Sequence, residues 1–180
     1  IHTFLSFTWI FLYKLFWNDW QIVIIPVSFI IINTLSYKFK WLKMIERNDD
    51  RKNHLGTVYF AIAITALMIL ALAFPTTIMQ TGLATFCLCF GDGLAAFIGS
   101  RVRNPIMIRK SKSIQGSIAC VLGAIIGTSI FSCIMKYSLP VPMYLLLGII
   151  TALLELVEKG LDNISISIGV YIVASLFIKQ

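Results

Sequence analysis

Seven apolar segments, each close to the length of a membrane-spanning helix, follow one another along this chain. A helix needs about 20 mostly apolar residues to cross the hydrocarbon core of a bilayer, with a range of roughly 17–25. The connectors between the segments contain proline, glycine and charged residues, as turns do. The sequence therefore predicts an all-α fold, a polytopic transmembrane helix bundle of about seven spans. The predicted segments are 1–17, 21–37, 57–74, 78–100, 117–135, 141–157 and 163–178.

The composition excludes an ordinary soluble domain. The 180 residues are 58% hydrophobic and only 13% charged, with a mean hydropathy of +0.88, whereas a soluble domain is about half apolar and about a quarter charged. We expect residues 1–180 to form a single integral-membrane domain. The chain begins at Ile1 without a basic region or a small-residue cleavage site. We therefore expect a first helix that lacks its extreme N-terminus, and not a signal peptide.

The distribution of charge predicts how the bundle is oriented. The loop 38–54 holds six basic and three acidic residues, and the loop 101–112 holds five basic residues and no acid. Two predicted spans separate these loops, so both lie on one side of the membrane, and the excess of Lys and Arg makes that side cytoplasmic. The turn 158–163 falls on the same side. The sequence therefore predicts a multi-pass protein whose polar site faces the cytoplasm.

Asp92 is a carboxylate inside an otherwise apolar segment. An ionised aspartate at such depth costs at least a few kcal/mol on insertion scales, and such residues usually face a cavity or a partner. Gly91 and Gly93 on either side of it allow a broken helix and a close approach of the backbone, which suits a site and a cap equally well. One interpretation is a structural aspartate that pairs with a lysine or caps a half-helix beginning at Gly93. We favour a functional site.

The basic loop ends on a group of residues suited to phosphate. Lys112-Ser113 and Gly116-Ser117 supply an ammonium, two hydroxyls and backbone N–H groups at the start of a predicted helix, where anions bind readily. The order of residues is not that of a P-loop. The alternative is that the loop serves only to orient the chain or attracts anionic lipid headgroups.

Two further acids lie at the same predicted end of the bundle. Glu155 lies at the end of the sixth apolar segment and Asp162-Asn163 opens the seventh. An Asp at a helix start is most often an N-cap, and a Glu at a helix end is often solvated. However, a hard cation such as magnesium prefers carboxylates together with substrate phosphates. Asp92, Glu155 and Asp162 are the acids that the predicted topology can bring together.

Several short motifs follow one another in order along the chain. They are Ile1-His2, Leu55-Gly56-Thr57-Val58-Tyr59-Phe60, Gly91-Asp92, Ala95-Ala96, Gly99, Lys112-Ser113, Gly116-Ser117, Glu155 and Gly160-Leu161-Asp162-Asn163. Together they resemble a known family, the polyprenol, phytol and dolichol kinases and the CTP-dependent diacylglycerol kinases. This family belongs to the wider membrane superfamily that includes the phosphatidate cytidylyltransferases. Gln115 stands where the family often has Glu, and the Gly-His-Gly-Gly-x-x-Asp-Arg-x-Asp pattern of the cytidylyltransferase branch is absent.

The resemblance implies phosphoryl transfer from CTP to the hydroxyl of a membrane lipid alcohol, such as phytol, a polyprenol or diacylglycerol, with Mg2+ as cofactor and no nucleic-acid partner. It implies catalytic roles for Asp92 and Glu155, either of which is a candidate base, and metal-binding roles for Asp92 and Asp162. The alternatives are a cytidylyltransferase that makes a CDP-lipid and a small transporter with Asp92 as its ion site. The nucleotide-binding candidates are Gly91, Arg101, Lys110, Lys112, Ser113, Gly116, Ser117 and Asn163.

Overall fold

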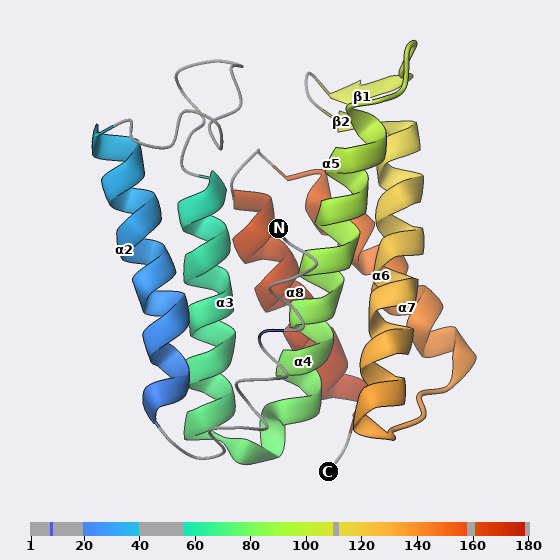
Figure 1. The fold of residues 1–180 in the computed structure, drawn as a ribbon. Helices are drawn as coiled ribbons and strands as arrows, with labels where there is room; N and C mark the ends of the chain where they lie inside the picture. Colours follow the sequence, from blue (N-terminus) through green and yellow to red (C-terminus); the bar gives the residue numbers. More distant parts are fainter. Residues whose placement is uncertain (1–7, 9–19, 40–55, 110–111, 158–160, 179–180) are drawn as a thin grey trace.

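Each of the last six apolar segments forms a helix in the structure, a computed structural model that describes residues 8, 20–39, 56–109, 112–157 and 161–178. The predicted first segment, 1–17, lies outside the described residues except for Thr8. The helices run side by side as a bundle (Figure 1). Their bounds are η1 Trp20–Val23, α2 Ile24–Phe39, α3 Gly56–Ala73, η2 Pro75–Thr77, α4 Ile78–Phe86, η3 Cys87–Asp92, α5 Gly93–Gly99, α6 Ile114–Met135, α7 Val141–Glu155 and α8 Leu161–Phe177.

Among the described residues, three helices are long and apolar enough to cross a membrane. They are α3 with 18 residues, the continuous helical run from Pro75 to Gly99 with 25, and α6 with 22. The helices α2, α7 and α8 are apolar but shorter. At a rise of 1.5 Å per residue, a helix of the length of α7 covers roughly 22 Å, less than the hydrocarbon thickness of about 30 Å. The helical bundle is confirmed, and the count of seven spans stays a prediction.

The outward faces of the helices are as apolar as their inward faces. On α6, Ile118, Leu122 and Ile126 recur at every fourth position and are 48–56% exposed. Similar stripes of exposed Leu and Ile run along α7 and α8. A helix that is apolar all round belongs in a hydrophobic core or in lipid, and these faces lie on the outside of the bundle. The exposed apolar faces of α6, α7 and α8 therefore fit a hydrocarbon environment.

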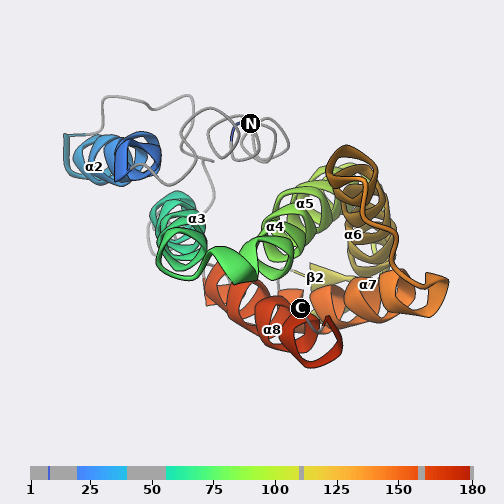
Figure 2. The ribbon, with the colours of Figure 1, turned by 90° about the horizontal axis from the view of Figure 1, so that it is seen from below.

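The helices α4 to α8 surround a common axis. Neighbouring pairs in contact include α4 with α8, α8 with α7, α7 with α6, and α6 with α5. Seen along the bundle, these helices form a ring, and the short strand β2, Lys112–Ser113, lies at its far end (Figure 2). The helix α3 packs outside on α8, and α2 packs on α3 (Figure 2). The core contains mainly apolar side chains such as Phe86, Leu88, Phe131 and Leu147.

The helix that carries Asp92 is continuous from Pro75 to Gly99, so the break that Gly91 and Gly93 allow does not occur. Instead, residues 87–92 form a π-helical segment, η3, between α4 and α5. Such wide turns place one extra residue in the helix and are frequent at functional sites. The pattern Gly123-Ala-Ile-Ile-Gly127 predicts close helix packing, and this is confirmed. A Cβ atom on Gly123 would lie 2.4 Å from the carbonyl oxygen of Phe90.

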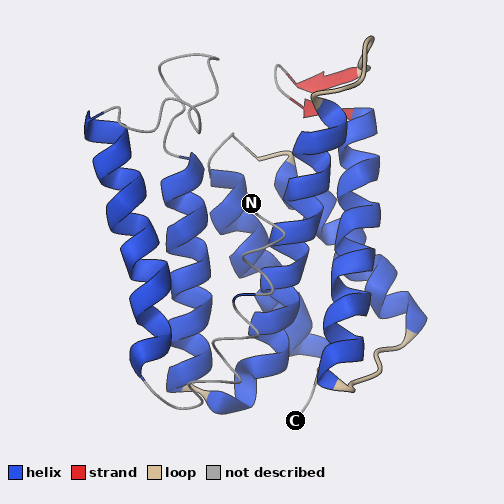
Figure 3. Ribbon diagram, in the orientation of Figure 1, coloured by secondary structure: helices blue, strands red, loops and turns tan. Residues whose placement is uncertain are grey.

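The all-α prediction is incomplete, because the basic loop contains a short antiparallel hairpin (Figure 3). It pairs β1, Met107–Arg109, with β2, Lys112–Ser113. The backbone N–H of Ile114 donates to the carbonyl of Ile106 at 2.9 Å, and the N–H of Ile106 donates to Oε1 of Gln115 at 3.1 Å. The first residues of α6 therefore hold the hairpin at the end of the bundle where α5 stops.

Candidate metal and phosphate site

Three carboxylates from three parts of the bundle meet below the hairpin. Asp92 ends η3, Glu155 ends α7, and Asp162 is the second residue of α8. One oxygen of each carboxylate lies within 4.8 Å of the other two. Glu155 and Asp162 are buried, at 5% and 4% exposure, and Asp92 is half-buried. The prediction that these three acids come together is confirmed.

Local chain geometry explains how the acids meet. Glu155 and Asp162 are close in the sequence, one at the end of α7 and the other at the start of α8, and the short chain between them limits how far apart they can lie. Asp92 depends on tertiary packing, because a Cβ atom on the preceding Gly91 would lie 2.8 Å from Cγ2 of Thr151 on α7. Thr151 is one helical turn before Glu155, and residues four apart share a face. Glycine at position 91 therefore lets α7 approach closely enough to bring Glu155 to Asp92.

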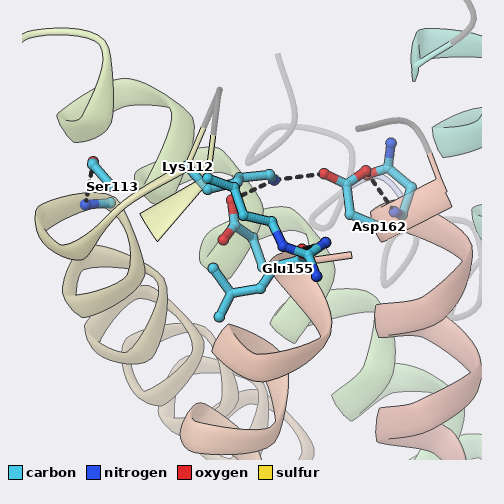
Figure 4. A network of polar contacts seen from close by, with 8 residues as sticks. Lys112, Ser113, Glu155 and Asp162 are labelled. Atoms are coloured by element: carbon cyan, nitrogen blue, oxygen red, sulfur yellow. Dashed lines mark hydrogen bonds and ion pairs between the residues drawn. The ribbon is translucent and has the colours of Figure 1, made fainter. Parts of the chain in front are cut away.

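Lys112 joins two of the acids. Its Nζ donates to Oε1 of Glu155 at 2.5 Å and to Oδ2 of Asp162 at 2.7 Å (Figure 4). The Lys112 side chain is 10% exposed and each carboxylate partner 6%. Burial by itself lowers the pKa of this amine, but the charges and hydrogen bonds of Asp162 and Glu155 outweigh burial and raise the pKa above its ordinary value. The ammonium is therefore charged at neutral pH.

The site also contains buried oxygen atoms that lack a hydrogen bond. Within the described part of the chain, these include Oε2 of Glu155 and Oδ1 of Asn163; Oγ of Ser117, near the start of α6, is also buried without a hydrogen bond. An unsatisfied buried polar atom is costly, commonly by about 1–3 kcal/mol, so each such atom calls for an explanation. The possible metal ligands at this site are oxygen atoms, and one carboxylate oxygen, Oε2 of Glu155, has no hydrogen-bond partner. Oxygen ligands are those that Mg2+ and Ca2+ prefer.

Asn163 ties the site to α3. Its Nδ2 donates to the carbonyl oxygen of Gly56 at 3.1 Å, and its backbone N–H donates to Oδ1 of Asp162 at 3.0 Å. The side chain is 5% exposed. Asn163 thus orients the Asp162 carboxylate through the backbone and fixes the start of α8 against the first residue of α3.

Ser113 and Gly116 have the geometry of a helix N-cap. The Ser113 hydroxyl accepts a hydrogen bond from the N–H of Gly116 at 3.1 Å, and this is the usual role of serine at a helix start. A Cβ atom on Gly116 would lie 3.4 Å from the carbonyl oxygen of Ala95. These two residues therefore seat α6 against α5. Their predicted contact with nucleotide stays a prediction.

Two nucleotide-binding candidates make contacts other than with the carboxylates, and a third lies outside the described residues. Arg101 is exposed, and its Nη1 donates to the carbonyl of Phe97 at 3.1 Å while its guanidinium lies over the Phe97 ring, 3.6 Å from the centroid. Gly91 is buried between helices, where its visible role is packing against Thr151. Lys110 lies outside the described residues.

Sequence reasoning overlooked Arg109. This residue is on β1 beside Lys112 in the hairpin register, and its Nη1 donates to the carbonyl of Leu156 at 3.0 Å. It therefore links the hairpin to the end of α7, directly after Glu155. The sequence shows Arg109 only as one of five basic residues in a loop, and nothing in that pattern indicates which of them turns toward α7.

Compared with family models, with curated proteins and with solved structures, the chain gives no match. The family resemblance therefore rests on the sequence motifs alone. The geometry by itself defines a buried, oxygen-rich site of three carboxylates with one lysine, at the end of an apolar helical bundle.

Proposed function

We propose that this protein is a CTP-dependent lipid kinase of the membrane, which phosphorylates the hydroxyl of a lipid alcohol and releases CDP. The observation that carries the proposal is the meeting of Asp92, Glu155 and Asp162 beside Lys112 in a bundle whose outer faces are apolar. Acids and a cation buried together at the end of such a bundle fit the binding of a metal-bound polyphosphate. The choice of CTP and of a lipid alcohol comes from the motif resemblance.

Phosphoryl transfer depends mainly on positioning and on neutralising charge around the transferred group. Asp92 and Asp162, with Glu155 beside them, would hold Mg2+, and the unpaired Oε2 of Glu155 supports a cation at this place. When bound, Mg2+ would neutralise and orient the phosphate oxygens. Lys112 would contact the phosphates directly, since its ammonium is already within the cluster. Asp92 or Glu155 would accept the proton of the alcohol.

The surroundings of the site suit a lipid substrate. A lipid alcohol dissolved in the bilayer has its chain among exposed side chains such as Ile118 and Leu122 of α6 and needs only its hydroxyl to reach the polar end of the bundle. The excess of basic residues in the loop 101–112 supports a cytoplasmic location for this end, where soluble nucleotides are found. The protein would therefore be multi-pass, with its active site at the cytoplasmic face.

Product analysis tests this proposal. Purified protein in detergent receives Mg2+, CTP or ATP labelled on the γ-phosphate, and a panel of phytol, farnesol, a polyprenol, diacylglycerol and phosphatidate. We expect label from CTP to appear on an alcohol, with CDP released. Pyrophosphate release together with a CDP-lipid would instead assign the protein to the cytidylyltransferases. If neither nucleotide is consumed with any of the lipids, the proposal of an enzyme is overturned. A small transporter would then be the better hypothesis.

A matched pair of variants assigns the activity to the site. Asp92→Asn keeps the size of the side chain and removes its charge, so we expect turnover to fall at least about 100-fold, the lower range for loss of a positioned acid–base group. Asp49→Asn makes the same chemical change in the loop 38–54 and should leave turnover unchanged. Full turnover by a well-folded Asp92→Asn protein would show that the chemistry lies elsewhere.

A further inference from the structure

The ammonium of Lys112 lies where a cation bound to the acids would lie. It donates to Oε1 of Glu155 and to Oδ2 of Asp162, and the remaining oxygen of Asp162, Oδ1, accepts the backbone N–H of Asn163. Both oxygens of Asp162 are therefore engaged. A metal ion that binds Asp162 directly must compete with Lys112 or with the backbone of α8.

We infer that Lys112 is an internal counter-ion which a metal must displace, so that metal binds tightly only together with a phosphate-bearing ligand that receives the ammonium. This inference deepens the proposed function and rests on it for the identity of the phosphate ligand. It makes Lys112 a positioning residue that sets the order of binding, because bare metal and the ammonium exclude one another.

Electrostatics supports this competition. Mg2+ binds carboxylate oxygens at roughly 2.1 Å, whereas Nζ of Lys112 is 2.5 and 2.7 Å from one oxygen of Glu155 and one of Asp162. Three positive charges would then crowd into a space of a few ångströms. The side chains are only 6–10% exposed, so water screens their repulsion poorly. A phosphate group relieves the repulsion by accepting the ammonium.

The coupling is reciprocal. If a phosphate ligand raises the affinity for metal by some factor, the metal raises the affinity for that ligand by the same factor. Removal of the ammonium abolishes the competition, so a variant without it should bind bare metal more tightly and depend less on phosphate. A purely structural lysine would have the opposite effect, since loss of a packed side chain would weaken the site for every ligand.

Calorimetric titration of the purified protein tests the inference with Mn2+ alone and with the preformed Mn2+–tripolyphosphate complex. We expect Lys112→Met to bind bare Mn2+ at least tenfold more tightly than the wild type, and Lys112→Arg, which keeps the charge, to bind it as weakly as the wild type. The control Arg103→Met removes one exposed cation from the same loop and should leave the affinity unchanged. The preference for the complex over bare Mn2+ should be large in the wild type and reduced at least tenfold in Lys112→Met.

Equal or weaker binding of bare Mn2+ by a cooperatively unfolding Lys112→Met protein would overturn the inference. If that variant does not fold, the wild type alone decides, because tight binding of bare Mn2+ with no preference for the tripolyphosphate complex also overturns it. The two proposals fail separately. If Lys112 competes with metal but no phosphoryl transfer is found, the proposed kinase activity is refuted. If phosphoryl transfer is found but Lys112 does not compete with metal, only the proposed role of Lys112 is refuted.

Discussion

Replacing Gly123 by alanine tests how closely α6 must approach the helix that carries Asp92. The added Cβ would lie 2.4 Å from the carbonyl oxygen and 2.9 Å from the carbonyl carbon of Phe90. Both atoms belong to the backbone of η3, so no side-chain rotation relieves the clash. To reach even the closest real Cβ contacts, near 3.0 Å, the two helices must separate by about 0.6 Å.

The energetic cost follows from that separation. Overpacking a close-packed interior costs typically about 1–3 kcal/mol, and the better helix propensity of alanine offsets at most about 1 kcal/mol of it. We expect a net loss of about 1–2 kcal/mol in the free energy of unfolding. Since Phe90 precedes Asp92 by two residues, the displaced η3 would also move Asp92 away from Glu155, so Mn2+ affinity should fall as well.

Thermal unfolding in detergent, followed by circular dichroism, measures the first effect. The control is Gly56→Ala, because a Cβ at the first residue of α3 meets no heavy atom within 4 Å, and this variant should be neutral or slightly more stable. If Gly123→Ala unfolds at the same temperature as Gly56→Ala, the predicted clash between α6 and η3 is refuted. If Gly123→Ala is less stable but binds Mn2+ with unchanged affinity, the predicted displacement of Asp92 is refuted.

Two further predictions concern particular contacts, and a third concerns the orientation in the membrane. Ser113→Ala should cost about 1 kcal/mol of stability through loss of the N-cap of α6, and a much larger loss of nucleotide affinity than of stability would instead show that the hydroxyl contacts phosphate. Asn163→Ala should lower stability by about 1 kcal/mol by removing the hydrogen bond to α3, and it should weaken Mn2+ binding by loosening the start of α8, which carries Asp162; titration of the metal would reveal this. In sealed vesicles, a cysteine replacing Arg103 should react with an impermeant reagent only from the cytoplasmic side and one replacing Ser138 only from the opposite side; the reverse pattern would place the site outside the cell or in a lumen.

The helices could be predicted from the sequence because their cause is local. Runs of apolar residues with few charges must satisfy their backbone hydrogen bonds internally in lipid, and a helix does so within one segment. The same reasoning placed Glu155 and Asp162 at one end with Asp92, since the number of spans between two loops decides their side. The proximity of the three acids could therefore be predicted from the sequence, although the distances between them could not.

The interactions of the basic loop could not be predicted in this way. Arg101, Arg109 and Lys112 have the same charge and lie in the same loop, yet Arg101 stacks on Phe97, Arg109 reaches Leu156, and only Lys112 bridges two carboxylates. The register of a short hairpin decides among them, and a shift of one residue reverses which side chains face inward. No periodicity in five basic residues contains that information.

By itself, the sequence determined the membrane-like helices, the common end of the acids and the small-residue contact at Gly123. Only the tertiary structure decided that η3 is a π-helical turn, that Gly91 admits Thr151, and that Lys112 neutralises part of the acid cluster. The physical reason is how far apart in the sequence the interacting residues lie. Hydrophobic patterning and backbone satisfaction act within a segment, whereas close packing and ion pairing join residues such as Lys112 and Asp162 that lie fifty positions apart.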